Sequence, residues 1–383
     1  MKEKETLYIV FDQLPLKASG GLVMSYANFV DAFKDIFEIK FISVFGHEPS
    51  DIEEFKNVSI IDLTDYKIDN RFYRAFSYLK QGKISIFVKA LLSAAYFFAY
   101  IPIARAKTKT LLANKKVIAS CPAAAIFLSK KVKFILEIHT SYDYFWGSNA
   151  LGRAQSTIAS NPILTIFRSN CDARKASTHF ESDYIYSYFG NLKSETSVSD
   201  FKIRKNKVLF IGRLSEEKNP LFLLDCAEAI KKQIDSFCLD IYGDGELEKP
   251  LSLEIKRRNM ADFVTLKGYT SDKSIYSNYS LLWLASKNEG LPLVMIEAMA
   301  NKVPVVTTNW GDAVFEIVSN GVNGYIANNV SEFVEASINL LTNEEKLKSM
   351  SENAFLLYKE KFTLESYKTK WIKILSTAYH GRQ

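Results

Sequence analysis

The sequence predicts an α/β protein made of two Rossmann-like, doubly wound domains that face each other across a cleft. Its 383 residues exceed what one ordinary hydrophobic core supports and suit two domains. The composition, with 48% apolar and 24% charged residues, is that of a globular protein. In both halves of the chain, short apolar segments alternate with segments whose apolar residues recur at helical spacing. This alternation is typical of parallel sheets covered by helices.

The first half is expected to form a domain over residues 1–195. A helix is expected at 21–36, directly after Gly20-Gly21, because its apolar residues recur at helical spacing. A second helix is expected at 161–175. Strands are expected at 7–12, 38–45, 58–63, 117–120, 132–139 and 177–180.

The second half repeats the pattern and is expected to form a domain over residues 200–363. The polar, irregular segment 191–206 is the expected linker. A final helix within 364–383 is expected to cross back to the first domain. Strands are expected at 207–211, 238–242, 264–266, 280–284 and 303–307.

Cysteine usage and the amino terminus favour a cytoplasmic protein. The four cysteines lie far apart, and none belongs to a Cys/His cluster, which argues against a zinc site and a disulfide framework. The apolar run 7–11 is too short for a signal peptide and is interpreted as the first strand.

A basic, apolar region predicts an anionic partner. Residues 70–136 contain thirteen Lys and Arg and no Asp or Glu. Within them, 84–104 is nearly all apolar and about long enough to span a membrane, although Lys89 and Pro102 weaken that interpretation. We expect a helix that packs on its own domain and faces an anionic membrane surface; a buried helix with a solvated basic face is the alternative. Nucleic acid is not expected, because none of the usual binding modules is visible. The residues expected to face the membrane are Lys83, Lys89, Arg105, Lys107 and Lys109.

The segment 287–300, with the sequence KNEGLPLVMIEAMA, follows an expected strand and opens a helix. Pro292 suits the first turn, so the backbone N–H groups of 290–293 would point at an anion such as a phosphate. Glu297 lies one to two turns into this helix, where its carboxylate can accept hydrogen bonds from a vicinal diol such as a ribose. Glu289 lies in the preceding loop. The alternative is an ordinary helix with one acid near its start and another on its surface.

The segment 210–220, with the sequence FIGRLSEEKNP, places two cations after a strand. Arg213 and Lys218 suit a diphosphate, Arg as a planar fork and Lys as a compact charge. Asn219 is expected to cap the next helix, and Pro220 to begin it. The alternative is a solvated loop whose cations pair with the adjacent acids.

Together these motifs resemble the retaining glycosyltransferases of family 4, which have the GT-B fold. Arg213 and Lys218 match the family's Gly-Arg-Leu-x4-Lys segment, and Glu289 and Glu297 match its pair of glutamates separated by seven residues. Segments that begin at Val303 and Glu316 follow in the family's order. The resemblance is specific over 207–327 and weaker over the first half.

The resemblance implies a role for each matching residue. Arg213 and Lys218 would bind the diphosphate and stabilise the charge that develops on it. Glu297 would hold the ribose hydroxyls, and Glu289 would contact the donor sugar near its 3- and 4-hydroxyls. The donor-binding residues implied are Gly20, Gly21, Gly212, Arg213, Lys218, Glu289, Gly290, Leu291, Leu293 and Glu297.

His139 follows an apolar strand and matches the family's histidine that faces the donor sugar. It would hydrogen-bond the donor or orient the acceptor rather than act as the principal base. A structural role is the alternative for His139, as a plain tight turn is for Gly20-Gly21. The catalytic residues implied are His139, Arg213, Lys218 and Glu289.

The chain departs from the family pattern near the expected donor sugar. Lys302 stands where the family usually has glycine, and 309–315 (NWGDAVF) replaces the usual pair of glycines and a proline. These departures bear on the identity of the donor sugar.

The function expected is metal-independent, retaining transfer of a sugar from a nucleotide diphosphate-sugar. A UDP-sugar is the first donor expected, and a GDP-sugar is the second. The acceptor expected is lipid-linked or part of a cell-surface polysaccharide or glycoconjugate, reached from the cytoplasmic side of the membrane. No metal or other cofactor is expected, because Arg213, Lys218 and helix N-termini can neutralise the diphosphate. Two alternatives are a non-catalytic accessory protein of the same fold and a nucleotide-sugar epimerase.

Overall fold

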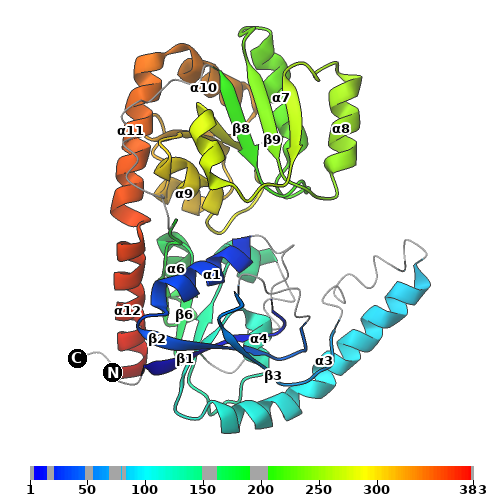
Figure 1. Cartoon of the computed structure of the whole chain (residues 1–383), viewed down its shortest axis with the longest axis vertical. Coiled ribbons are helices and arrows are strands. Elements are labelled where there is room, and N and C mark those ends of the chain that lie inside the picture. The colour runs from blue at the N-terminus through cyan, green and yellow to red at the C-terminus, as the bar shows by residue number, and fades with distance from the viewer. Residues whose placement is uncertain are drawn as a thin grey trace. The chain divides into compact units, whose positions relative to one another are not determined.

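The computed structural model divides the chain into two compact units (Figure 1). The first comprises Met1–Phe167, Ala173–Tyr184 and Trp371–Gln383, and the second comprises Arg168–Asp172 and Ile185–Lys370. Each unit is built on one parallel sheet with helices, so the predicted fold class, two Rossmann-like α/β domains, is confirmed. Gly20 and all but Asn206 of the expected linker lie outside the described residues. The structure describes residues 4–14, 21–47, 55–68, 79, 83–148, 162–189 and 206–380.

The first unit holds a seven-stranded parallel sheet in the order β3-β2-β1-β4-β5-β6-β7. The strand order reverses between β1 and β4, and ligands of open parallel sheets bind at such a switch point, outside the carboxyl ends of the strands. The strands are β1 (Glu5–Phe11), β2 (Phe37–Ser43), β3 (Ser59–Asp62), β4 (Lys116–Ala119), β5 (Ile135–Glu137), β6 (Leu164–Phe167) and β7 (Ser182–Tyr184). The helices are α1 (Gly21–Phe33), α3 (Ile84–Leu111), α4 (Pro122–Ile126) and α6 (Asn170–Ala176), with a π-helical turn at Asp143–Ser148.

Two expectations for the first unit were wrong. The helix expected at 161–175 is in fact the strand β6 followed by the short helix α6. Three of the four β6 residues are fully buried in the sheet, and a short buried apolar run does not distinguish strand from helix by its spacing. The strand expected at 177–180 is a turn, and β7 begins only at Ser182. The strand expected at 132–139 is limited to β5.

The second unit holds a six-stranded parallel sheet in the order β10-β9-β8-β11-β12-β13, which reverses between β8 and β11. Helices α7, α8 and α10 contribute to one hydrophobic cluster, and α9 and α11 contribute to another. The strands are β8 (Lys207–Ile211), β9 (Cys238–Tyr242), β10 (Val264–Gly268), β11 (Leu281–Leu284), β12 (Val305–Thr308) and β13 (Gly324–Ala327). The helices are α7 (Pro220–Lys231), α8 (Glu248–Arg257), α9 (Leu293–Ala300), α10 (Val330–Thr342) and α11 (Glu344–Lys361), with 3₁₀ turns η6 (Lys273–Asn278) and η7 (Asp312–Glu316).

The last helix, α12 (Leu364–His380), is shared by the two units. From Trp371 onward it is part of the first unit, where the buried Trp371 ring meets Phe29 edge-on at 5.2 Å between ring centres. The Tyr379 hydroxyl donates to the carbonyl oxygen of Val117 at 2.6 Å and accepts from the N–H of the same residue at 2.7 Å. The carboxyl-terminal part of α12 therefore contributes to the core around β4 and α1.

A glycine loop after β9 supports the loop after β8. Gly243 has φ +142°, and a Cβ atom on it would lie closer than 3.0 Å to the carbonyl oxygen of Gly212. The N–H of Leu214 donates to the carbonyl of Asp244 at 2.7 Å. Only glycine permits this close approach, which fixes the backbone on both sides of Arg213.

We expect Gly243→Ala to lower the free energy of unfolding by at least about 2 kcal/mol, because the new methyl group clashes with backbone. Gly268→Ala is the matched control, since Gly268 also has positive φ (+71°) but a Cβ there meets nothing within 4 Å. It should cost about 1 kcal/mol of backbone strain. Denaturant titration followed by tryptophan fluorescence measures both, and equal losses would contradict the argument.

Candidate functional site

The loop after β8 carries the two cations singled out in the sequence. Arg213 is exposed at the carboxyl edge of the sheet, and Lys218 lies in a tight turn whose N–H donates to the carbonyl of Ser215 at 3.1 Å. Pro220 begins α7 as expected. Asn219 takes the cap position, but its backbone is left-handed (φ +50°) and its side chain makes no capping hydrogen bond. The expected side-chain cap was therefore wrong.

The loops after β8 and β11 are joined by a backbone hydrogen bond and by a side-chain ion pair. The backbone N–H of Lys287 donates to the carbonyl of Glu217 at 2.8 Å. The Lys218 ammonium forms an ion pair with Oε1 of Glu289, and these side chains are 24% and 10% exposed. Ser286 donates to the same oxygen at 2.6 Å. The structure thus brings together Lys218 and Glu289, which are 71 residues apart in the sequence.

Helix α9 begins directly beyond this ion pair. It starts at Leu293, and Pro292, which was expected in the first turn, is the cap residue before it, in extended conformation (φ −71°). Gly290 and Leu291, in the loop that leads into α9, are buried. The first N–H groups of a helix carry partial positive charge, which favours an anion at this end. The β8 and β11 loops therefore offer cations and helix N–H groups at the switch point of the sheet.

Glu297 lies inside α9 and is only 6% exposed. Tyr276 of η6, fully buried, donates to Oε2 of Glu297 at 2.5 Å, and the Lys273 ammonium lies 2.7 Å from Oε1. Burial first, and then the charge and hydrogen bond of Glu297, raise the pKa of Tyr276 well above its usual range, so its hydroxyl remains a donor. The carboxylate is consequently held from both sides.

The candidates of the first unit form a separate group. His139 follows β5, and its Nε2 lies 3.3 Å from the Tyr26 hydroxyl and 3.4 Å from Oε2 of Glu137. The Tyr26 hydroxyl also donates to Glu137, and both residues are buried, with 2% and 1% exposure. Gly21 is the first residue of α1. The histidine therefore lies in a tyrosine–glutamate–histidine cluster at the carboxyl end of β5.

Sequence reasoning missed the partners of the predicted residues. Glu137 had a visible signal, because it is an acid inside an otherwise apolar strand. Tyr26, Lys273, Tyr276 and Ser286 had none, since their contacts depend on elements that meet only after folding.

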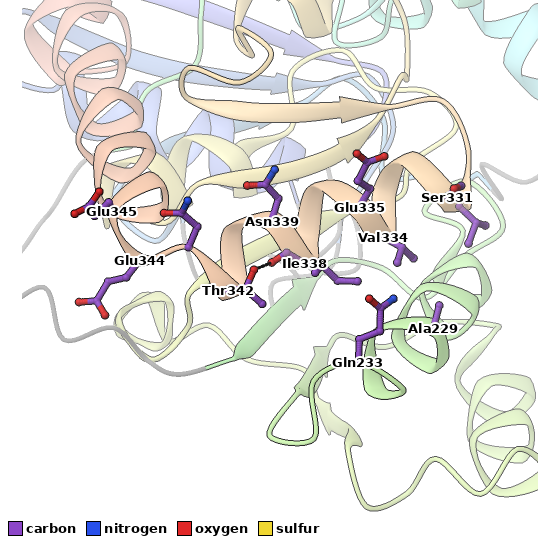
Figure 2. Close-up of a pocket in the computed structure, with 12 residues that line it drawn as sticks. Ala229, Gln233, Ser331, Val334, Glu335, Ile338, Asn339, Thr342, Glu344 and Glu345 are labelled. Atoms are coloured by element: carbon purple, nitrogen blue, oxygen red, sulfur yellow. Dashed lines mark hydrogen bonds between the residues drawn. The ribbon is translucent and has the colours of Figure 1, made fainter.

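Two further features lie apart from these residues. Within the described ranges, no group of three His, Cys, Asp or Glu side chains is arranged to hold a metal ion. A groove between α7, α10 and the start of α11 contains none of the predicted site residues (Figure 2). Its lining includes Ala229, Gln233, Val334, Ile338, Glu344 and Glu345.

Comparison with known proteins supports a transferase. Residues 193–356 match the family model described as glycosyl transferases group 1, and this span contains Arg213, Lys218, Glu289 and Glu297. A Haemophilus influenzae protein described as an uncharacterized glycosyltransferase is 26% identical, over 96% of this chain and 99% of its own. The protein is a glycosyltransferase. A Bacillus subtilis poly(glycerol-phosphate) α-glucosyltransferase is 31% identical over 46% of this chain, which corresponds to 27% of that relative.

Solved structures share the fold of this glycosyltransferase. TarM matches with a TM-score of 0.75 at 14% identity, covering 98% of this chain and 99% of that one. HepE of Anabaena, solved with UDP, matches with a TM-score of 0.72 at 16% identity, covering 97% and 100%. These similarities confirm the GT-B fold that the motifs implied.

The buried Tyr26–Glu137 bond should appear as a coupling energy. In a double-mutant cycle of Tyr26→Phe and Glu137→Gln, we expect at least about 1 kcal/mol of coupling in the free energy of unfolding, because the bond is buried and its acceptor ionisable. The exposed bond from Thr6 to Glu38, at 2.8 Å, is the control. A Thr6→Val, Glu38→Gln cycle should give coupling within about 0.5 kcal/mol of zero. Equal coupling in the two cycles would contradict the expected strength of the buried bond.

Proposed function

We propose that the protein is a retaining hexosyltransferase of family 4. It transfers a sugar from a nucleotide diphosphate-sugar to a lipid-linked or cell-surface glycan acceptor. The first donor proposed is a UDP-sugar, and the second is a GDP-sugar. The observation that carries the proposal is that the β8 and β11 loops are joined by the Lys218–Glu289 ion pair. The first of these loops also carries the exposed Arg213, and the second leads into α9. A cationic, N–H-rich edge suits a diphosphate.

In the reaction proposed, the bond between the sugar C1 and the diphosphate oxygen breaks, and C1 bonds to the acceptor oxygen on the same face. The acceptor proton passes to the departing phosphate oxygen. Arg213, Lys218 and the α9 N-terminus stabilise the charge that grows on that oxygen. No cation is needed for this, since the protein supplies the positive charge.

The Lys218–Glu289 ion pair would fix the spacing between two subsites. Lys218 meets the diphosphate, while Glu289, also held by Ser286, accepts hydrogen bonds from donor-sugar hydroxyls. Glu297 accepts hydrogen bonds from the ribose hydroxyls. The roles that the family resemblance implies for His139, contact with the donor sugar or orientation of the acceptor, and for Gly20 and Gly21, donor binding, are part of the proposal.

The relatives favour a glycan acceptor of the bacterial envelope. A Staphylococcus aureus relative is named poly(ribitol-phosphate) α-N-acetylglucosaminyltransferase, and a Campylobacter jejuni relative acts on an undecaprenol-linked saccharide. The names specify α-transferases, and retention at an α-linked donor gives an α-linked product. HepE structures contain UDP and UDP-glucose.

Helix α3 supports a site at the inner face of the cell membrane. Within the described part of the chain, it alone is long and apolar enough to cross a membrane, by length and composition only. One face, however, is buried in its own unit, with residues three or four apart: Ala90, Ser93, Phe97, Tyr100, Ala104 and Thr108. The opposite side exposes large apolar side chains: Ile84, Val88, Leu91, Leu92, Phe98 and Ile103. Such a helix suits the plane of the interface better than a span.

The basic residues of α3 divide into two sets. Lys83, Lys89 and Lys109 are exposed and can meet anionic headgroups. Arg105 donates from Nε to the carbonyl of Ile126 at 2.9 Å, and Lys107 donates to the carbonyl of Leu63. These two stabilise the docking of α3 on its own unit, so the proposed lipid contact rests on the other three and the apolar side chains.

The donor test is hydrolysis of a panel of UDP- and GDP-sugars by the full chain, with and without EDTA. We expect slow, EDTA-resistant release of nucleoside diphosphate from one donor. Lys218→Ala and Glu297→Ala should each reduce that release by roughly 100-fold, as removal of a transition-state or substrate-binding charge does. The exposed Lys232→Ala should leave it unchanged. Loss of activity with EDTA contradicts metal independence, and no cleavage of any donor favours the accessory alternative.

The membrane test is co-sedimentation with vesicles of phosphatidylglycerol and phosphatidylcholine. Replacing Leu92 and Phe98 with Glu should weaken binding at least about 10-fold, because two exposed apolar contacts are lost. Leu253→Glu on α8, where Leu253 is 68% exposed, is the matched control and should leave binding unchanged. Equal binding of the wild-type chain to pure phosphatidylcholine vesicles would contradict the electrostatic part of the proposal.

A further inference from the structure

Two buried tyrosines lie three residues apart in η6 and its cap, yet their hydroxyls have different partners. Tyr276 donates to Glu297 of α9 at 2.5 Å. Tyr279 donates to Asp240 of β9 at 2.8 Å and lies 3.4 Å from the hydroxyl of Tyr242. The first of these tyrosines bonds a residue that is proposed to bind the donor, whereas Asp240, which accepts from the second, is not one of those residues.

The Glu297 carboxylate has an inner and an outer oxygen. The inner one, Oε2, accepts from Tyr276, whose ring is fully buried. The outer one, Oε1, meets the Lys273 ammonium, and that lysine side chain is 33% exposed. The partner of the outer oxygen is therefore a partly exposed side chain, whereas the partner of the inner oxygen is fully buried.

A buried carboxylate needs such partners. Leaving it without a hydrogen bond would cost more than the bond is worth, since the desolvated charge is not compensated. The backbone of Glu297 is fixed as well, because Asn301 donates from Nδ2 to its carbonyl at 2.8 Å. The main chain, the inner oxygen and hence the carboxylate plane are set before any ligand binds.

We propose that Tyr276 is a specificity-determining positioning residue for the nucleoside ribose. By donating to Oε2, the Tyr276 hydroxyl orients the carboxylate so that both ribose hydroxyls can donate hydrogen bonds to it. The ribose then displaces the Lys273 ammonium from Oε1. The protein thereby selects a ribonucleoside diphosphate over its 2′-deoxy form. This inference rests on the proposed contact between Glu297 and the ribose.

The test measures affinities of the full chain for UDP and 2′-deoxy-UDP, and for GDP and 2′-deoxy-GDP, by calorimetric titration. For the base that binds, the wild-type chain should prefer the ribonucleotide by roughly 10- to 100-fold, the worth of a hydrogen bond to a charged acceptor. Tyr276→Phe should reduce this preference below about threefold, because affinity for the ribonucleotide falls while affinity for the 2′-deoxy form changes by no more than about twofold.

Tyr279→Phe is the matched control, since it removes from the same segment a tyrosine hydroxyl that also donates to a carboxylate, that of Asp240. It should keep the full preference, and thermal melting of both variants checks that each is folded. Lys273→Gln should also keep the preference, because Tyr276 still sets the carboxylate plane. If Tyr276→Phe keeps the preference, or if Lys273→Gln alone removes it, the inference is wrong.

Glu297→Gln separates this inference from the function on which it rests. If it retains the full ribose preference, then Glu297 does not read the ribose and the proposed donor site is wrong at that point. If Glu297→Gln loses the preference and Tyr276→Phe does not, the donor site stands and only the role of Tyr276 fails. Failure of all four nucleotides to bind the wild-type chain contradicts both.

Discussion

The donor side of the molecule depends on the hydrogen-bonded contact between the loops after β8 and β11. In a parallel sheet whose order reverses between these strands, the two loops leave in opposite directions and open a crevice. Here the hydrogen bond from the N–H of Lys287 to the carbonyl of Glu217 and the Lys218–Glu289 ion pair hold the two loops together. Gly243 and Gly245 support the loop after β8, because their lack of a side chain lets the loop after β9 pack directly against the backbone of Gly212 and Leu214. Cations, acids and the start of α9 thus acquire defined spacing from backbone geometry.

Much of this could be predicted from the sequence, for a physical reason. Strands β8 and β9 have the bounds that the sequence predicted. In β8 the last four residues form a continuous buried apolar run, and in β9 buried residues alternate with partly buried ones. The site residues Arg213, Lys218 and Glu289 lie in the loops after strands, and Glu297 lies in the helix that follows one of these loops. Such positions are local, so spacing along the chain is enough to find them.

The rest depends on contacts between distant segments. The 161–175 stretch was expected to be one helix, and it folds as β6 and α6 because β5 and β7 flank it and bury its apolar residues. Tyr276 precedes Glu297 by 21 residues and reaches it only when η6 packs on α9. Asn219 looked like a helix cap, but the turn that carries Lys218 forces its backbone into the left-handed region, where its side chain cannot reach the helix N–H groups.

Each unit uses the same device at the carboxyl edge of its sheet. Among the described residues, the buried glutamates are Glu137 and Glu297, and each accepts a hydrogen bond from a buried tyrosine. A phenol suits this position because its ring fills the core while its hydroxyl donates a hydrogen bond. In Tyr276, burial raises the pKa of the hydroxyl, so it stays protonated and remains a donor. A lysine in its place would be a charge that the core must also desolvate. In both units the second group at that carboxylate, His139 or Lys273, is partly exposed. The buried pair therefore sets the geometry, and the exposed partner is the one positioned to respond to a ligand.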